Sequence, residues 1–308
     1  MQRYILGRIL QALLSAIAIS VIVFVLAHIS GDPLALILPM DATDEMEAEL
    51  EAHYGLDKPL PVQYGLYISR AVRGDFGRSL MTHRPVTEMI SGRIAATLQL
   101  SGVAIIISIL ISVPIGVYSA VRNGGIFDAV SRIFAVVGQS IPSFWLGLML
   151  MLIFAVNLGW LPTSGKGGWQ NLIMPAFTLG WFQAAGIMRM TRSSMLDVLD
   201  TEYVKLARIK GVSRIMVVWK HALKNALVPI VTYAGLRFVA LIVGTVVVET
   251  VFAWPGIGRL AIESIRFRDF PVVQTVVLFF GLMYIGVNLM VDILYAYINP
   301  KIRYSVSK

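Results

Sequence analysis

The sequence contains no cysteine, and only 14% of its 308 residues are charged, whereas 57% are hydrophobic. Without cysteine the chain has no disulfide framework, no thiolate zinc site and no cysteine nucleophile. Soluble domains carry about 25% charged and under 50% apolar residues. A soluble core of the present composition would have too little polar surface to cover it. Lipid must therefore be the solvent for much of this chain.

Motifs for nucleotide binding and for metal or serine hydrolysis are also missing. The string nearest to a P-loop, Gly165-Lys166-Gly167, lacks the hydroxyl residue that follows the lysine in that motif. There is no H-E-x-x-H, and the four histidines are isolated, with His28 at the end of an apolar stretch where we expect it at the membrane interface. An intramembrane serine protease would need a histidine at membrane depth. We therefore expect no enzyme, and no cofactor or metal bound by this chain.

Long intervals without charge predict an all-α, polytopic membrane protein with six transmembrane helices. Each interval exceeds the roughly 20 residues that cross about 30 Å of hydrocarbon as a helix. The expected spans are 9–29, 98–120, 134–156, 172–191, 226–248 and 273–297. The first could instead be a secretory signal, but its apolar run is long and no small-x-small cleavage site follows, which favours an uncleaved anchor.

The distribution of charge predicts the orientation of these spans. The N-terminus, the second and fourth loops and the C-terminus together hold 15 basic and 4 acidic residues, whereas the other loops hold 10 basic and 13 acidic ones. Cytoplasmic loops of membrane proteins are enriched in Lys and Arg. Both termini are therefore expected in the cytoplasm, and the net charge of +8 needs no nucleic-acid partner.

Two segments between spans are long enough to carry function. Segment 30–97, expected outside the cell, begins with an acidic cluster at 41–51, which we interpret as a solvated helix face because the EF-hand glycine and spacing are absent. Its later apolar residues should pack on the bundle; they are Tyr54, Leu56, Tyr64, Leu66, Tyr67, Phe76 and Leu80. Cytoplasmic segment 189–225 predicts an amphipathic helix before Gly211 and a second one from Ser213 to Lys224. This segment could lie on anionic lipid or dock on a partner.

Apart from Arg189, which is counted with the fourth loop, two charged residues fall inside the expected spans. Asp292, one turn after Asn288, suggests a helix-packing pair with a basic partner near the inner face. Arg237 lies about 18 Å along its helix from Asn225. A guanidinium at that depth should face protein or water rather than lipid. It could line a pathway, contact another subunit, or join an ion pair or carbonyl cluster between helices.

Residues 202–213, followed by 221–229, resemble the cytoplasmic signature of permease subunits of ATP-driven (ABC) importers. More specifically, they are similar to the first permease subunit of the dipeptide, oligopeptide, glutathione and nickel branch. Lys205 and Leu206 stand where the general signature has Glu and the first Ala, while Ala207 and Gly211 are retained. Pro229 lies 18 residues after Gly211, which is several more than in the general pattern. Both departures are typical of the peptide branch.

Further motifs extend the resemblance over essentially the whole chain. They are Gly31-Asp32-Pro33, Gly74-Asp75-Phe76-Gly77-Arg78-Ser79, Arg84-Pro85-Val86, residues 248–260, residues 292–296 and residues 299–304. Each stands at the position in the topology that the family requires.

The resemblance implies a type I ABC importer permease fold in a bacterial inner membrane. The implied division is 1–94 (first helix and extracytoplasmic segment), 95–298 (transmembrane domain with five helices and a coupling helix at about 202–224) and 299–308 (cytoplasmic tail). The implied partners are a second, homologous permease, two ATP-binding subunits that hold ATP and Mg, an extracytoplasmic solute-binding protein and membrane lipid. The implied cargo is a dipeptide, an oligopeptide or a related solute such as glutathione.

The same resemblance implies roles for individual residues. Coupling to the ATPases is expected at Glu202, Tyr203, Ala207, Arg208, Lys210, Gly211, His221 and Asn225. Arg237 is a candidate for the pathway, and Trp254, Pro255 and Gly256 are candidates for contact with the binding protein. The alternative function is a self-sufficient secondary carrier or channel. A carrier needs ion-binding groups in its spans, which are nearly absent here, whereas an ATP-driven permease needs a cytoplasmic docking helix.

Overall fold

The computed structural model describes residues 2–29 and 57–298, and the regular elements of this part are helices. Their bounds are α1 Gln2–Ile29, α3 Leu60–Val72, α4 Val86–Val121, α5 Ile126–Ser140, α6 Ser143–Leu150, the π-helix η2 Met151–Asn157, α7 Gln170–Leu199, α8 Glu202–Ile209, α9 Arg214–Met216, the π-helix η3 Val217–Ala222, α10 Leu223–Val251, α11 Ile257–Arg266 and α12 Phe270–Ile298.

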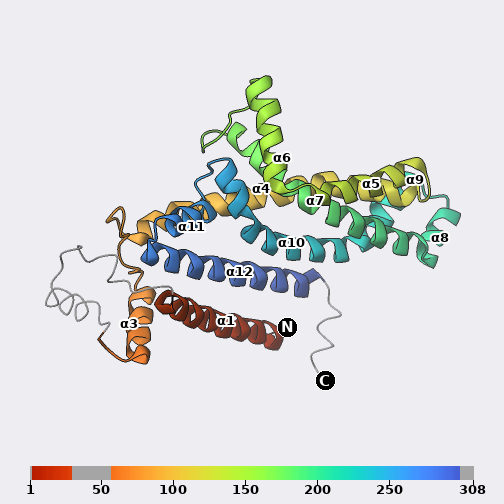
Figure 1. Cartoon of the computed structure of the whole chain (residues 1–308). Coiled ribbons are helices and arrows are strands. Elements are labelled where there is room, and N and C mark those ends of the chain that lie inside the picture. The colour runs from red at the N-terminus through yellow and green to blue at the C-terminus, as the bar shows by residue number, and fades with distance from the viewer. Residues whose placement is uncertain (1, 30–56, 299–308) are drawn as a thin grey trace.

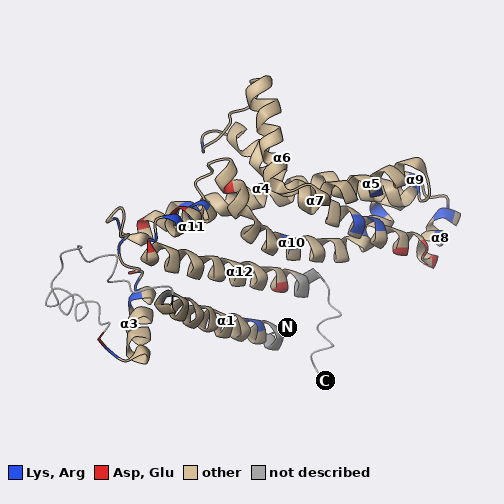
Figure 2. Cartoon of the chain, in the orientation of Figure 1, with Lys and Arg blue, Asp and Glu red and all other residues tan. Residues whose placement is uncertain are grey.

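Long helices form the body of the molecule. α7 packs between α4 and α10, α10 also packs on α12, and α1 lies along the far side of α12 (Figure 1). α8 and α9 lie at one end of this body, whereas α11 and α3 lie at the other end. Charged residues concentrate towards the two ends and are sparse between them (Figure 2). This separation is expected for helices whose middle parts lie in hydrocarbon.

Membrane-spanning helices are recognised here by length and apolar composition. Within the described residues, Ile5–Leu26, Val86–Val121, Arg214–Val251 and Phe270–Leu294 qualify. A bent pair, Ile126–Ser140 with Ser143–Asn157, adds a fifth span if it counts as one. The helix predicted at 172–191 is present within α7, which is long but less apolar. The structure is therefore polytopic and helical, while the total of six spans stays a prediction.

The prediction of one continuous span at 134–156 is wrong. The helix stops at Ser140, and the next one starts at Ser143 with its axis turned by 99°. Pro142 explains the break, because a proline disfavours the helical conformation of the residue before it. Ile141 indeed has an extended backbone (φ −80°, ψ 120°).

The predicted second helix does begin after Ser213, its N-cap, but the predicted end at Lys224 is wrong. α9, η3 and α10 follow one another without a gap, so the helix that starts at Arg214 continues to Val251. The span expected from residue 226 therefore begins in the cytoplasmic segment. The proposed boundary between 94 and 95 falls within α4.

Packing of the outer segment on the bundle is confirmed for its described part. On α3, the Tyr64 hydroxyl lies 2.8 Å from the Ser20 hydroxyl of α1, and the His28 ring hydrogen-bonds Gln63. Farther on, Phe76 packs edge-on against Phe279 of α12. The acidic cluster, Tyr54, Leu56, the motif at 31–33 and the tail from 299 lie outside the described residues.

The polar strip of the last helix has the partner that was predicted. Asp292 of α12 lies 3.4 Å from a guanidinium nitrogen of Arg8 on α1. Because both residues sit near the ends of their helices on one side of the molecule, the pair connects the peripheral helix α1 to α12. Asp292 is therefore a packing residue.

Candidate coupling site and translocation path

Helix α8, which the charge bias predicts to be cytoplasmic, is short, charged and sharply ended. Lys205 donates a hydrogen bond to the Glu202 carboxylate and lies 3.5 Å from Asp200. The hydrogen bond to Glu202, then the charge of Asp200, raises the pKa of the Lys205 ammonium above its usual value. Gly211 closes the segment with φ +78°, a left-handed conformation that favours glycine.

Helices α8, α9 and η3 carry exposed apolar side chains on a face that the rest of the described chain leaves uncovered. Val204 is fully buried and anchors α8, whereas Ile209 is 80% exposed and Ile215 is 76% exposed. We call the exposed set the docking surface; its members are Tyr203, Leu206, Ile209, Ile215, Met216 and Trp219. Glu202, Arg208 and Lys210 are exposed beside it. An apolar patch with a charged rim is typical of a protein–protein contact.

Tyr203 connects α8 to the start of α10. The side-chain amide of Asn225 donates to the Tyr203 hydroxyl at 2.6 Å, and both groups lie 3.3 Å from the carbonyl oxygen of His221. His221 belongs to η3, and π-helical turns are frequent at functional sites. Three of the predicted coupling residues are thus brought together, although Tyr203 and Asn225 are 22 positions apart.

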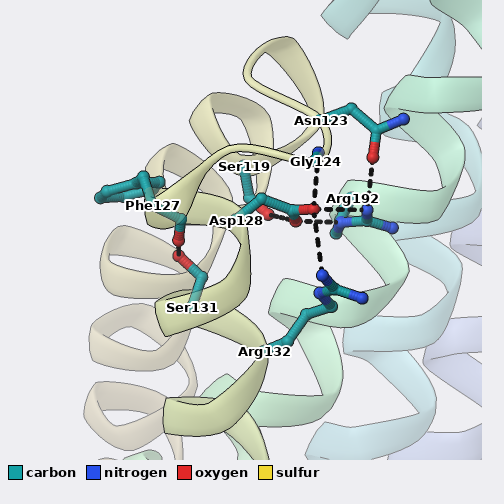
Figure 3. A network of polar contacts seen from close by, with 8 residues as sticks. All are labelled: Ser119, Asn123, Gly124, Phe127, Asp128, Ser131, Arg132 and Arg192. Carbon is teal, nitrogen blue, oxygen red and sulfur yellow. Dashed lines mark hydrogen bonds and ion pairs between the residues drawn. The ribbon is translucent and has the colours of Figure 1, made fainter.

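A buried carboxylate joins α5 to α4 and to the part of α7 that leads into α8. Asp128, in the first turn of α5, is 1% exposed and accepts two hydrogen bonds from Arg192 of α7, at 2.6 Å from Nε and 2.9 Å from Nη2. Ser119 of α4 and the backbone N–H of Gly124 also donate to it, and the Arg132 guanidinium lies 3.6 Å away (Figure 3). We call this group, completed by Asn123, which accepts from Arg192, the cytoplasmic clamp.

Arg237 lies midway along α10 and is half-buried. Its guanidinium donates to the Tyr233 hydroxyl one turn earlier and lies over the same ring, 4.7 Å from its centroid. Tyr233 in turn packs on Gly186 of α7, where a Cβ would come within 2.6 Å of the hydroxyl. Within the described residues no carboxylate lies within 4 Å of Arg237. The ion pair considered from the sequence is therefore not found in this part of the chain.

At the opposite end, the loop after α10 closes on a second buried carboxylate. Glu249 is fully buried and accepts hydrogen bonds from the Thr97 hydroxyl at 2.6 Å and from the Arg259 backbone N–H at 3.0 Å. A Cβ at Gly256 would overlap this carboxylate, so the close approach requires glycine. Trp254 is 1% exposed, and its indole N–H donates to the carbonyl of Ala96.

These contacts decide which part of the loop can meet another protein. Trp254 and Gly256 are buried, while Pro255 is partly exposed. Trp254 therefore fixes the loop on α4, and any surface for a binding protein would come from its neighbours. Lys166, 5.8 Å from the Trp254 ring centroid, brings the loop before α7 to the same place.

Comparison with known families gives two matches that run along most of the chain. Residues 112–304 match the family described as "Binding-protein-dependent transport system inner membrane component", and residues 1–101 match the N-terminal part of such membrane components. The chain belongs to this family. It is accordingly a transport component of the inner membrane and not an enzyme.

Relatives of this permease cover its full length. The glutathione transport system permease protein GsiC of Salmonella choleraesuis (strain SC-B67) is 46% identical over 305 residues, which cover 99% of this chain and all of the relative. GsiC of Escherichia coli (strain K12) is 44% identical over the same length. The recognition of the dipeptide and glutathione branch is thereby confirmed.

Solved structures confirm the fold. A chain of the MetNI methionine ABC transporter in an inward-facing conformation has a TM-score of 0.58 and 20% identity, with 68% of this permease and 96% of that chain covered. A chain of an amino acid ABC transporter with histidines has a TM-score of 0.52 and 16% identity, covering 68% of the permease and 94% of that chain. The type I permease fold expected from the sequence is therefore present.

Within this permease, sequence reasoning located the helix α8 but missed the residues that hold the bundle ends together. Asp128, Arg192 and Glu249 entered only as loop charges. One signal was available for Asp128, because it is the only acid in a loop whose other charges are Arg122 and Arg132. No signal near Glu249 pointed to Thr97, which lies 152 positions away.

Proposed function

We propose that this chain is one permease subunit of an ATP-driven importer and forms, with a second homologous permease, the translocation pathway for glutathione or other short peptides. The observation that carries the proposal is the 46% sequence identity, over the full length, to a glutathione transport permease. The docking surface on α8 supports it, because the chain has no nucleotide motif and must receive its energy by contact with another protein.

The proposed partners follow from the two ends of the molecule. Two ATP-binding subunits, which hold ATP and Mg, would join the complex, and one of them would take the docking surface around Tyr203, Leu206 and Ile209 into its cleft. An extracytoplasmic binding protein would deliver the solute near Pro255. Both termini would then lie in the cytoplasm, as the positive-inside bias indicates. Membrane lipid covers the remaining apolar faces, and no nucleic acid takes part.

Arg237 is proposed to line the pathway. Its guanidinium is oriented by Tyr233 and has no carboxylate partner in the described part of the chain. A guanidinium without a carboxylate partner can donate two parallel hydrogen bonds to the carboxylate of a peptide. Trp254, Pro255 and Gly256 are proposed to shape the delivery surface, the first and last by fixing the loop and Pro255 by contact.

The proposal is tested by co-expressing the chain with its candidate partners in membrane vesicles. Labelled glutathione, a dipeptide and an unrelated amino acid are offered together with loaded binding protein and ATP. We expect uptake of a peptide only when the ATPases and both permeases are present. Transport by this chain alone, without ATPases, would instead establish the secondary carrier or channel.

Gly211 provides the sharpest variant for the coupling role. Gly211→Val should abolish ATP-driven uptake while the complex still accepts loaded binding protein, because a branched side chain strains the left-handed backbone at φ +78°. Nothing lies within 4 Å of a Cβ at this position, so the effect is conformational and not a clash. Gly211→Asn is the matched control, since asparagine tolerates this conformation. Wild-type uptake and substrate-stimulated ATP hydrolysis in the valine variant would remove the coupling role, and binding of this segment to lipid would replace it.

A further inference from the structure

We propose that the cytoplasmic clamp, centred on Asp128 and Arg192, is the positioning element that makes α5 follow the coupling helix α8 during transport. This inference rests on the proposed function and adds a route to it. The function itself requires only that α8 moves with an ATPase. The clamp determines which helices move with it.

The first step of the route is the continuity between α8 and α7. Arg192 lies on α7, ten positions before Glu202, and α8 follows α7 after a turn of two residues. A displacement of α8 is thus applied to the end of α7 that carries Arg192. The Arg192 side chain is 22% exposed, and its Nε and Nη2 donate to different oxygens of Asp128, which fixes the direction of approach as well as the distance.

The second step is the tight packing of α7 on α4 beside the clamp. A Cβ at Gly116 of α4 would lie 2.8 Å from the carbonyl oxygen of Met188, and one at Gly180 of α7 would lie 2.6 Å from that of Ala104. Backbones this close cannot slide independently, because the packing has no room to adjust. α4 and α7 therefore form one body, and Ser119 presents its hydroxyl from that body to Asp128.

The third step is the attachment of α5 to this body. α5 starts after the short turn that contains Asn123 and Gly124, and its first turn places Asp128 where the helix N-terminus favours a carboxylate. The single carboxylate is bound from α4, from the turn and from α7 at once (Figure 3). α5 then leads through the 99° bend into α6, whose Gly147 lies against Phe252 near the outer loop. A clamp at the start of α5 can thus pass motion on to the opposite end of the molecule.

The decisive test compares transport with ATP hydrolysis in the assembled complex. Asp128→Asn retains the size of the side chain and removes its charge. We expect the complex to assemble and hydrolyse ATP but to move roughly tenfold fewer substrate molecules per ATP, the size of effect expected for a residue in a coupling network. The exchange Asp128→Arg with Arg192→Asp should restore part of the ratio. Asp292→Asn is the matched control, because it removes a charge of another ion pair on the same side, which does not touch α7 or α8.

A second measurement reports the geometry of the two helices instead of the transport rate. Because the chain has no cysteine of its own, single cysteines can be introduced for spin labels at Val130 of α5 and Asp197 of α7, which are both exposed. The distribution of distances between the two labels should be narrow, and its mean should be the same in the nucleotide-free and ATP-bound complex. It should broaden in Asp128→Asn but not in Asp292→Asn.

The outcomes separate the two proposals. A wild-type ratio of transport to hydrolysis in Asp128→Asn, or a label distance that changes between nucleotide states of the wild type, overturns the clamp and leaves the importer intact. Absence of ATP-dependent uptake by the wild-type complex overturns the importer. In that case the label distances decide about the clamp separately. A broader distance distribution in Asp128→Asn would support the clamp as the connection between α5 and α7, and an unchanged distribution would refute it.

Discussion

Two carboxylates are fully buried at opposite ends of this bundle, and they are stabilised by different kinds of group. Asp128 is held by the guanidinium of Arg192, on the part of α7 that leads into α8, with help from Ser119. Glu249, near the outer loop, is held by the hydroxyl of Thr97 and by a backbone N–H. No Lys or Arg side chain in the described residues lies within 4 Å of Glu249.

The different partners of Asp128 and Glu249 suit the two ends of the bundle to different tasks. The Asp128–Arg192 pair joins α5 to α7 by two charge-assisted hydrogen bonds, so it would keep the two helices together when α7 moves. The Glu249 contacts hold the loop after α10 on α4 through a hydroxyl and a backbone N–H. The end that carries α8 is therefore suited to transmit motion, whereas the opposite end is suited to present a constant surface.

The largest effect is expected from Gly256→Ala at the outer end. The new Cβ would overlap the Glu249 carboxylate, which is fully buried and has no space to retreat. Overpacking should lower the free energy of unfolding by about 3 kcal/mol or more, measured as loss of folded complex on heating in detergent. Gly168→Ala is the control, because nothing lies within 4 Å of its Cβ. Equal melting of the two variants would show that the outer end is looser than described.

Asp128→Asn should come next. Asparagine can keep the contacts with Ser119 and Gly124 but leaves Arg192 without its charge partner. Because Arg192 remains partly open to water, we expect roughly 2–3 kcal/mol of destabilisation, below the range for a fully buried broken pair. Thermal unfolding at low and at high salt provides the measurement. A loss smaller than that of the Asp292→Asn control would contradict the dominant role of this pair.

Glu249→Gln should cost less than Asp128→Asn. Both Thr97 and the Arg259 backbone N–H donate to Glu249. The NH2 group of glutamine would face one of these donors, whereas its carbonyl oxygen would still accept from the other. A single impaired hydrogen bond is worth about 1 kcal/mol. The comparison is made by melting both variants in the same detergent. If Glu249→Gln proved the more damaging change, charge would matter at the outer end after all, and the contrast between the two ends would fail.

How much of this could be predicted from the sequence depends on sequence separation. Charge-free intervals located α1, α4, α10 and α12, and hydrophobic length alone is enough for that. The amphipathic pattern before Gly211 located α8. The 99° bend was missed because it depends on one proline, Pro142, in a stretch that otherwise reads as a continuous span.

The two buried carboxylates were missed for a different reason. Their partners come from other helices: Arg192 is 64 positions from Asp128, and Thr97 is 152 positions from Glu249. No local pattern reports such pairings, because they are made by packing. The same limit applies to Trp254, whose place in a conspicuous loop motif suggested contact with a partner, whereas its side chain is anchored on Ala96.

The smallest effect on stability is expected at Arg237. Unlike Asp128 and Glu249, this charged residue contacts only one neighbouring side chain in the described part of the chain, so its substitution tests whether the guanidinium binds the substrate. Its contacts in the described chain are the hydroxyl and the ring face of Tyr233. A glutamine could reach the hydroxyl and would lose only the cation–π contact, so Arg237→Gln should change the unfolding free energy by about 0.5 kcal/mol. Uptake of a peptide with a free carboxylate should nevertheless require a roughly tenfold higher concentration for half-maximal rate, since a hydrogen bond to a charged group contributes on this scale. The same peptide with its carboxylate amidated should show no difference between wild type and variant, and Arg237→Lys should lie in between because lysine keeps the charge but not the fork. Equal concentration dependence for the free peptide in wild type and Arg237→Gln would assign Arg237 to helix packing alone.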